Sequence, residues 1–251
     1  MCEFSCHRRS VAKRVLLAAE RGRLASRVSL LALSLFCGAT MPRVIAQTPT
    51  PVIVPTWRYD LTHVGANTNE TALTPANVNV NTFGKLFSLT VDGSVYAQPL
   101  YVNGLTMSDG QVHNVLFVAT EHDSIYAFDA DSNGGANANP IWKITMLDAA
   151  HGAGPGATTM PNTDEGSPDI APEVGITGTP FINTSTNTMY VVSKTKESGT
   201  YCARLHAINI RTGAELPGSP VAISATVNGT GNGSSGGSCH SVRCGRTTGR
   251  R

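Results

Sequence analysis

The feature that most constrains this chain is a series of short apolar and β-branched segments separated by clusters of Gly, Asn, Asp and Pro, a pattern typical of strands. Five such segments come before residue 148, at 83–91, 96–102, 115–120, 124–129 and 141–147. Four more come after residue 172, at 178–183, 188–194, 204–210 and 221–227. After residue 47 there is no convincing segment with the 3.6-residue apolar period of a helix, so we predict an all-β chain.

The two series of strands repeat each other. The matching segments are 97–102 with 177–182, 116–119 with 189–192, and 125–129 with 205–209. The register is maintained, because Pro99 and Pro180 are 81 positions apart and Ala127 and Ala207 are 80 apart. Four antiparallel strands repeated with a fixed signature are typical of a propeller blade.

We therefore predict a partial β-propeller with about two four-stranded blades, at about 94–147 and 174–228, plus an N-terminal outer strand at 83–91. A β-sandwich built from the same strands is the structural alternative. A closed ring needs about four blades or more, so two blades leave open sheet edges and a half-covered apolar face. The expected partners therefore include the remaining propeller blades.

Residues 1–46 have the features of a secretory signal peptide. A basic stretch at 21–27 precedes an uninterrupted run of apolar and small residues at 28–39, and Val44, Ile45 and Ala46 then suit a signal peptidase. The run is too short for a stable membrane span, which needs about 20 residues. We expect a secreted or periplasmic protein, with 47–82 as an N-terminal extended segment; a retained anchor helix is the alternative.

The net charge of +2 averages three different regions. Residues 1–46 carry +6, residues 239–251 carry +4, and the remaining region, 47–238, carries −8. Because phosphate binding needs a basic face, the acidic body argues against nucleic acid as a partner. A glycan or another small molecule is the ligand class left open.

The end of the chain departs from the pattern of the body. After the flexible stretch at 229–238, the sequence becomes basic and rich in cysteine at 239–251, without an apolar run of strand length. We interpret this as a frameshift or an assembly break near residue 238. A natural basic tail is the alternative.

Residues 57–238 resemble quinoprotein alcohol dehydrogenase-like propellers, the family with a pyrroloquinoline quinone (PQQ)-like repeat found in large secreted proteins of environmental bacteria. The resemblance is carried by WRYD at 57–60, GANTNETALTP at 65–75, NVNVNTFGKLF at 77–87, SIYAFDAD at 124–131, and GTP at 178–180 before YVV at 190–192. It implies that a full-length relative oxidises an alcohol or sugar with PQQ and calcium held on the propeller axis. A non-catalytic extracellular binding or scaffold propeller is the alternative.

No catalytic or cofactor-binding residue carries over from this resemblance. Enzymes of that family often have a disulfide between adjacent cysteines, and this sequence has no adjacent cysteines. It also lacks the blades that would complete an axial pocket, so we expect no cofactor in this part of the protein. Fold analogy alone does not establish an oxidoreductase.

The candidate metal ligands are weak. Asp129, Asp131 and Asn133 have the spacing of oxygen ligands that opens a calcium loop, although the twelfth position is Pro140 where a bidentate acid is needed. A polar hairpin turn explains the same pattern. Glu173 is a further candidate, because it lies next to the expected inner strand of a blade.

Two other polar segments are candidates for function. The insert between the two series holds His151, Asp164, Glu165 and Asp169 among glycines and prolines, and long loops on a rigid scaffold often carry function. Solvated acids on a loop are the alternative. The run at 121–123 (EHD) joins two strands, and its simplest interpretation is a solvent-facing hairpin turn.

Overall fold

The computed structural model describes residues 2–6, 51–165, 169–230 and 238–240. Its regular elements are strands and short 3₁₀ turns, with no α-helix in these ranges. The fold is therefore all-β, as predicted. No helix of the described part is long and apolar enough to cross a membrane.

The first sheet has five antiparallel strands in the order β2-β4-β5-β6-β7. Their bounds are β2 Ile53–Val54, β4 Leu100–Thr106, β5 Val112–Ala119, β6 Ser124–Asp129 and β7 Trp142–Thr145. The strands β4 to β7 lie within the range 94–147, for which one blade is predicted. β4 begins later than expected because residues 96–99 do not join the ladder, and its register shifts between Val102 and Leu105.

The second sheet is built around the hairpin of β11 Thr188–Glu197 and β12 Thr200–Asn209. One side of β11 pairs with β10 Phe181–Asn183 and, further along, with β8 Ala157–Pro161, which also pairs with β9 Glu173–Val174. β12 pairs with β13 Val221–Ala222 on its other side. The insert at 148–172, expected as a loop, thus contributes a strand to this sheet.

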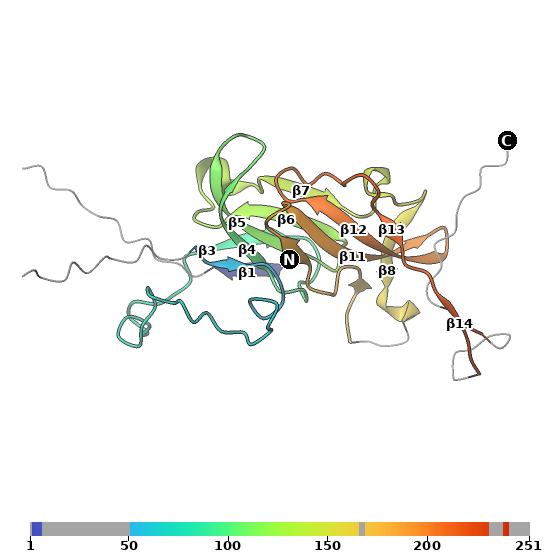
Figure 1. Ribbon diagram of the computed structural model, residues 1–251, viewed down its shortest axis with the longest axis horizontal. Coiled ribbons are helices and arrows are strands. Elements are labelled where there is room, and N and C mark those ends of the chain that lie inside the picture. Colours follow the sequence, from blue (N-terminus) through green and yellow to red (C-terminus); the bar gives the residue numbers. More distant parts are fainter. Residues whose placement is uncertain (1, 7–50, 166–168, 231–237, 241–251) are drawn as a thin grey trace, which may run out of the picture.

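Two short pairs of strands lie outside these sheets. β3 Phe87–Val91 pairs with β1 Cys2–Cys6, and β14 Thr226–Asn228 pairs with β15 Ser238–His240. The single strand expected at 221–227 is therefore two strands with different partners. In Figure 1, β14 projects away from the stacked sheets. Most of the expected signal peptide and all of 241–251 lie outside the described residues.

The two sheets share one apolar core, to which buried side chains of both contribute. Figure 1 shows the strands of the two sheets next to each other at the centre of the molecule. The first sheet contributes Phe117 and Ile125, and the second contributes Met189, Val191 and Ile208. Two packed antiparallel sheets, of five and six strands, are the arrangement of neighbouring propeller blades, so the partial propeller is confirmed. The N-terminal segment bridges the two units, since the N–H of Ile182 donates to the carbonyl of Pro55 (2.7 Å).

The opposite face of the first sheet packs against β3. Leu116, Val118 and Phe128 form a second core cluster there with Leu89 and Val91 of β3. The strand expected at 83–91 is thus present, although shorter. It covers a face of the first sheet and does not extend its hydrogen-bonded ladder.

Candidate functional site

The turn between β5 and β6 carries three ionisable residues: Glu121, His122 and Asp123. It is tight, because the N–H of Asp123 donates to the carbonyl of Thr120 (3.1 Å) and the φ of Asp123 is 53°. Aspartate tolerates this left-handed conformation better than most residues. The hydroxyls of Thr120 and Ser124 both donate to Asp92 (2.9 and 2.7 Å), which holds the turn in place.

Glu121 is fully buried in this turn. Its Oε2 accepts hydrogen bonds from the N–H of Gly175 (2.8 Å) and the hydroxyl of Thr177 (3.0 Å), on the segment that leads into β10. Its Oε1 has no hydrogen-bond partner. Burial raises the pKa of Glu121, and the two hydrogen bonds offset only part of that effect.

Asp123 is also fully buried, and neither of its carboxyl oxygens has a hydrogen-bond partner of normal geometry. Burial raises the pKa of Asp123 well above its usual value. The backbone N–H of Lys194 opposes this shift, while the charges of Glu121 and Glu173 add to it. The expectation of a solvent-facing turn is therefore wrong: two of its three side chains point into the protein, where their charged forms are costly.

His122, the third side chain of the turn, remains 45% exposed. Its Nδ1 lies 2.9 and 3.0 Å from the two carboxyl oxygens of Glu173 on β9. The hydroxyl of Thr159 on β8 donates to the same carboxyl group (2.7 Å), so that Glu173 is held from two sides. Among the described residues, no hydrogen-bond partner is found for the outer nitrogen of His122, Nε2.

Two glycines allow these groups to approach so closely. A Cβ atom on Gly175 would lie 2.4 Å from the carbonyl oxygen of Glu121 and 2.9 Å from Cγ of Asp123. A Cβ atom on Gly93, whose φ is +60°, would lie 2.8 Å from the backbone nitrogen of His122. Contacts this short exclude any side chain at either position without a shift of the backbone.

The arrangement is suited to proton transfer. A carboxylate that contacts one imidazole nitrogen orients the ring and stabilises its protonated form, which leaves the other nitrogen to exchange a proton with a bound molecule. The Glu173–His122 pair has this geometry at the end of the first sheet, where the turn meets the segment entering the second. We name His122, Glu173 and Thr159 the histidine site.

The calcium-loop candidates are held in a hydrogen-bonded turn. One oxygen of Asp129 accepts from the backbone N–H groups of Asp131 and Ser132 (2.9 and 3.0 Å), and its other oxygen contacts Nδ1 of His113 (3.0 Å). Asn133 donates its amide to the carbonyl of Ser88. This is the geometry of the polar turn, and Glu173 is not part of it.

The polar residues of the insert are dispersed. His151 is buried and contacts Asp148 (2.7 Å), whereas Asp164 and Glu165 form surface ion pairs with lysines of β11. The backbone carbonyl of Asp169 accepts from the hydroxyl of Tyr96 (3.3 Å). Across the described ranges, no three His, Cys, Asp or Glu side chains are grouped so that they could hold a metal ion.

The inward face of the second sheet carries a buried polar network that the sequence did not reveal. Arg204 forms an ion pair with Glu197, and Nδ1 of His206 contacts Glu215 (2.9 Å). Burial lowers the pKa of His206, and Glu215 opposes that shift. The alternation of residue types along β12 could have indicated that Arg204 and His206 share one face of the strand. It does not indicate that this face is the buried one.

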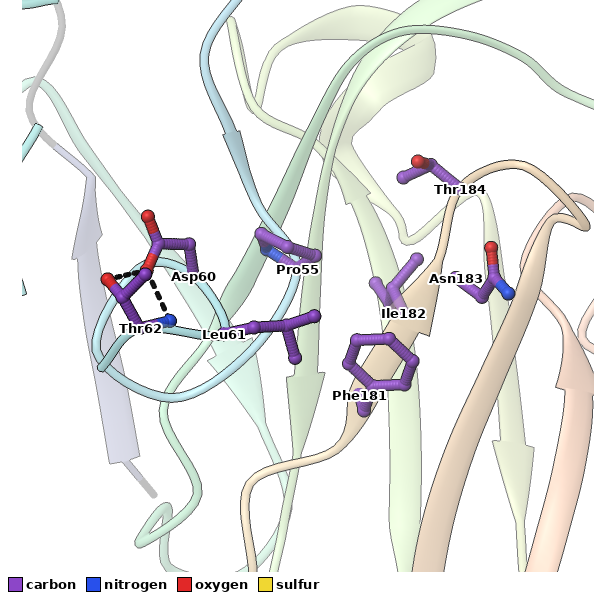
Figure 2. A pocket seen from close by; sticks show the side chains of 8 residues that line it. All are labelled: Pro55, Asp60, Leu61, Thr62, Phe181, Ile182, Asn183 and Thr184. Atoms are coloured by element: carbon purple, nitrogen blue, oxygen red, sulfur yellow. Dashed lines mark hydrogen bonds between the residues drawn. The ribbon is translucent and has the colours of Figure 1, made fainter.

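A shallow concavity of about 410 Å³ lies between the N-terminal segment and β10. One wall is formed by Pro55 and residues 60–62, and the other by residues 181–184. In Figure 2 the side chain of Leu61, on the first wall, extends toward Phe181 on the second, while Asp60 accepts hydrogen bonds from the N–H and hydroxyl of Thr62. The concavity is apolar and brings together no set of reactive groups.

Comparison with known proteins identifies one distant structural neighbour and no related family. No family model matches the sequence, and no curated protein matches it. Among solved structures, a europium-containing methanol dehydrogenase is similar at 18% sequence identity, with a TM-score of 0.33. The match covers 56% of this chain and 19% of that chain. A likeness this distant assigns neither an activity nor site residues.

Proposed function

We propose that this chain is the N-terminal part of an exported, quinoprotein-like β-propeller that oxidises an alcohol or a sugar, with His122 as the base that accepts the hydroxyl proton. The observation that carries the proposal is the contact of Glu173 with Nδ1 of His122, at 2.9 and 3.0 Å. The motifs at 57–87 and 124–131 support the choice of reaction class. Export is supported by the basic and apolar pattern of residues 1–46.

Oxidation of an alcohol removes a proton from oxygen and a hydride from carbon. Nε2 of His122 is placed to take the proton, because Glu173 contacts the opposite nitrogen and fixes the orientation of the ring. Thr159 keeps the carboxylate aimed at the ring. The carboxyl groups of Glu121 and Asp123, in the same turn as His122, are buried. Burial raises the pKa of each, so both resist ionisation.

The resemblance implies PQQ and calcium, and the described residues do not fit that pair of groups. No three acidic, histidine or cysteine side chains among them are grouped to hold a cation, and the carboxylate of Glu173 is occupied by His122 and Thr159. The chemistry that we assign to this chain is therefore proton transfer alone. The acceptor of the hydride belongs to the rest of the complete protein.

The test is dye reduction by the complete propeller, supplied with PQQ and calcium and offered a panel of alcohols and sugars. We expect His122→Asn to lower kcat by about 10²–10⁴-fold, the usual contribution of a general base. Glu173→Gln should also lower kcat, by a smaller factor than His122→Asn. His113→Asn is the matched control, because His113 also contacts carboxylates but lies away from the turn.

Two results would contradict the proposal in different ways. Full activity of His122→Asn would exclude His122 as the base while leaving the reaction class in place. Failure of the complete protein to retain PQQ would remove the oxidoreductase assignment. The apolar concavity lined by Leu61 and Phe181 would then favour the second candidate, a binding module for a glycan or another small molecule.

A further inference from the structure

The connection between β7 and β8 carries a buried histidine on a capped turn. We call residues 148–156 of this connection the strap. Its short 3₁₀ turn, Ala149–His151, begins after Asp148, whose Oδ1 accepts from the N–H of His151 (2.9 Å) and lies 2.7 Å from Nδ1 of the same residue. His151 is only 6% exposed. The turn therefore holds an imidazole against the interior of the protein.

Two glycines bring the strap into close contact with the second sheet and the loop that follows β12. A Cβ atom on Gly152, whose φ is +79°, would lie 2.5 Å from Cγ of Pro220. A Cβ atom on Gly154 would lie 2.6 Å from Oε2 of Glu197 on β11. Contacts this short exclude a side chain at either position without a shift of the neighbouring atoms. The strap is thus fitted closely to its surroundings.

The hydrogen bonds that attach the strap come from single groups and form no ladder. Nε2 of His151 lies 3.3 Å from the carbonyl oxygen of Gly213, and the hydroxyl of Ser198 donates to the carbonyl of Pro155 (3.1 Å). By contrast, β12 is paired along its length with β11 and also with β13. Because the strap belongs to no strand, it is held less firmly than the sheet beside it.

His206 on β12 is fully buried, with both of its ring nitrogens in contact with polar groups. Nε2 lies 2.8 Å from the hydroxyl of Ser193, and Nδ1 lies 2.9 Å from Oε2 of Glu215. The other carboxyl oxygen of Glu215 accepts from the hydroxyl of Ser219 and the N–H of Ala207. The arrangement suits a neutral imidazole, in which Nδ1–H donates to Glu215 and Nε2 accepts from Ser193.

The charged groups that face His206 come from three elements: Arg204 from β12 itself, His151 from the strap, and Glu215 from the loop after β12. Burial lowers the pKa of His206, Glu215 opposes that shift, and the charges of His151 and Arg204 add to it. The neutral form is therefore favoured where the strap is in place. Its contribution to this packing is present above pH 6.5 and declines as the pH falls below that value.

We propose that the strap is an acid-released cover of the second sheet, which detaches when His206 takes up a proton. The imidazolium must donate from Nε2 to Ser193, so the hydroxyl proton of Ser193 loses its acceptor, and a positive charge is added beside Arg204. β12 cannot move away without breaking its pairing with β11 and β13. The strap is therefore the element that yields.

Release of the strap would act on the histidine site. The strap continues directly into β8, whose Thr159 donates to the carboxyl group of Glu173. Detachment up to residue 156 would free the start of β8, so acid would weaken the contact that keeps Glu173 in place. This consequence rests on the proposed function, whereas release of the strap does not and is tested without any redox activity.

Hydrogen–deuterium exchange of the full chain, followed by mass spectrometry at about pH 7.5 and about pH 5, tests the proposal. Rates are corrected for the intrinsic effect of pH on exchange. The amides of His151, Gly152 and Ala153 report on the strap, because they donate to carbonyls of Asp148 and Ala149. We expect their protection to fall by about tenfold at the lower pH, since release takes up one proton.

His206→Gln is the first variant, because a side-chain amide can donate to Glu215 and accept from Ser193 without titrating. Its strap should stay protected at both pH values. Glu215→Gln is the second variant, and it should enlarge the loss of protection in acid, because the imidazolium then lacks its carboxylate partner. His113→Asn is the matched control: His113 contacts two carboxylates in the first sheet, and its replacement should leave the response of the strap unchanged.

Three results would overturn the inference. The first is protection of the strap that does not change with pH. The second is a loss of protection that extends equally to β6, which would be global unfolding. The third is an acid response that persists in His206→Gln when its far-ultraviolet circular dichroism shows a folded chain. If His206→Gln does not fold, Glu215→Gln decides, and a response no larger than that of the unaltered chain overturns the inference.

Discussion

The central strands of the two sheets repeat in sequence but differ in burial. All five residues from Val115 to Ala119 of β5 are buried, because the first sheet is covered on one side by the second sheet and on the other by β3. In β11 the first residues after Met189 alternate, with Val191 buried and Tyr190 and Val192 exposed. The apolar side chains of a sheet are therefore buried only where another element packs on them. The second sheet is packed on one face by the first sheet, and its other face keeps apolar side chains exposed.

The largest expected effect compares equivalent aromatic residues. Phe117→Ala should lower the free energy of unfolding by about 3–5 kcal/mol, because it leaves a cavity between the sheets. Tyr190→Ala should cost about 1 kcal/mol, mainly from its stacking on Phe181. Urea unfolding followed by circular dichroism measures both. Equal costs would mean that Tyr190 is buried in solution, for example by another chain.

A smaller effect is expected where the turn of the first sheet meets the segment entering the second. Gly175→Ala should cost about 1–3 kcal/mol, because its Cβ would overlap the backbone of Glu121 and the carboxyl group of Asp123. Gly178→Ala, three residues further on, meets no atom within 4 Å and should change stability by less than about 1 kcal/mol. Thermal unfolding of the two variants makes the comparison. If Gly175→Ala left the unfolding temperature unchanged, the close contact between Gly175 and the turn at 121–123 would be contradicted.

The smallest expected effect is on the pH dependence of stability. The raised pKa of Asp123 means that the folded state holds a proton that the unfolded state loses near pH 3.8. Its contribution to stability is therefore fully present below pH 3.8 and is lost as the pH rises through the folded-state pKa. Asp123→Asn should remove this decline, which we would measure as the difference between the two unfolding curves from pH 4 to 8.

Asp109→Asn is the control for that measurement. The N–H of Gln111 lowers the pKa of the Asp109 carboxyl group, so its contribution is present above pH 3.8 and is lost as the pH falls. The two substitutions should change the pH dependence in opposite directions. A change of the same sign in both would contradict the burial of Asp123.

The sequence predicted the parts of the structure that depend on local pattern. The strands at 124–129 and 188–194 were placed correctly at their first residues, and the repeat of about 80 residues appears in the structure as matching hairpin registers. The turn at 121–123 was placed correctly between its strands, but its exposure was not. A run of three polar residues looks solvated until its neighbours are known.

The sequence singles out Glu173 and the turn that contains His122 separately, but it does not predict that they form one site with Thr159. Glu173 was singled out as a weak metal candidate, whereas the structure pairs it with His122, 51 positions earlier, and with Thr159 of the insert. The insert itself was expected to be a loop, although five of its residues form β8. Such pairings depend on where the chain returns in space, which strand periodicity does not encode.

By itself, the sequence determined that this chain is built of β-strands, that they form two matching groups, and that two groups leave an apolar face uncovered. Only the tertiary structure decided which face that is and which polar groups are buried. The physical reason is that side-chain alternation is a local property of each strand, whereas burial depends on what packs against it. Tyr190 and Phe117 have equivalent places in their strands, and only their neighbours make one exposed and the other buried.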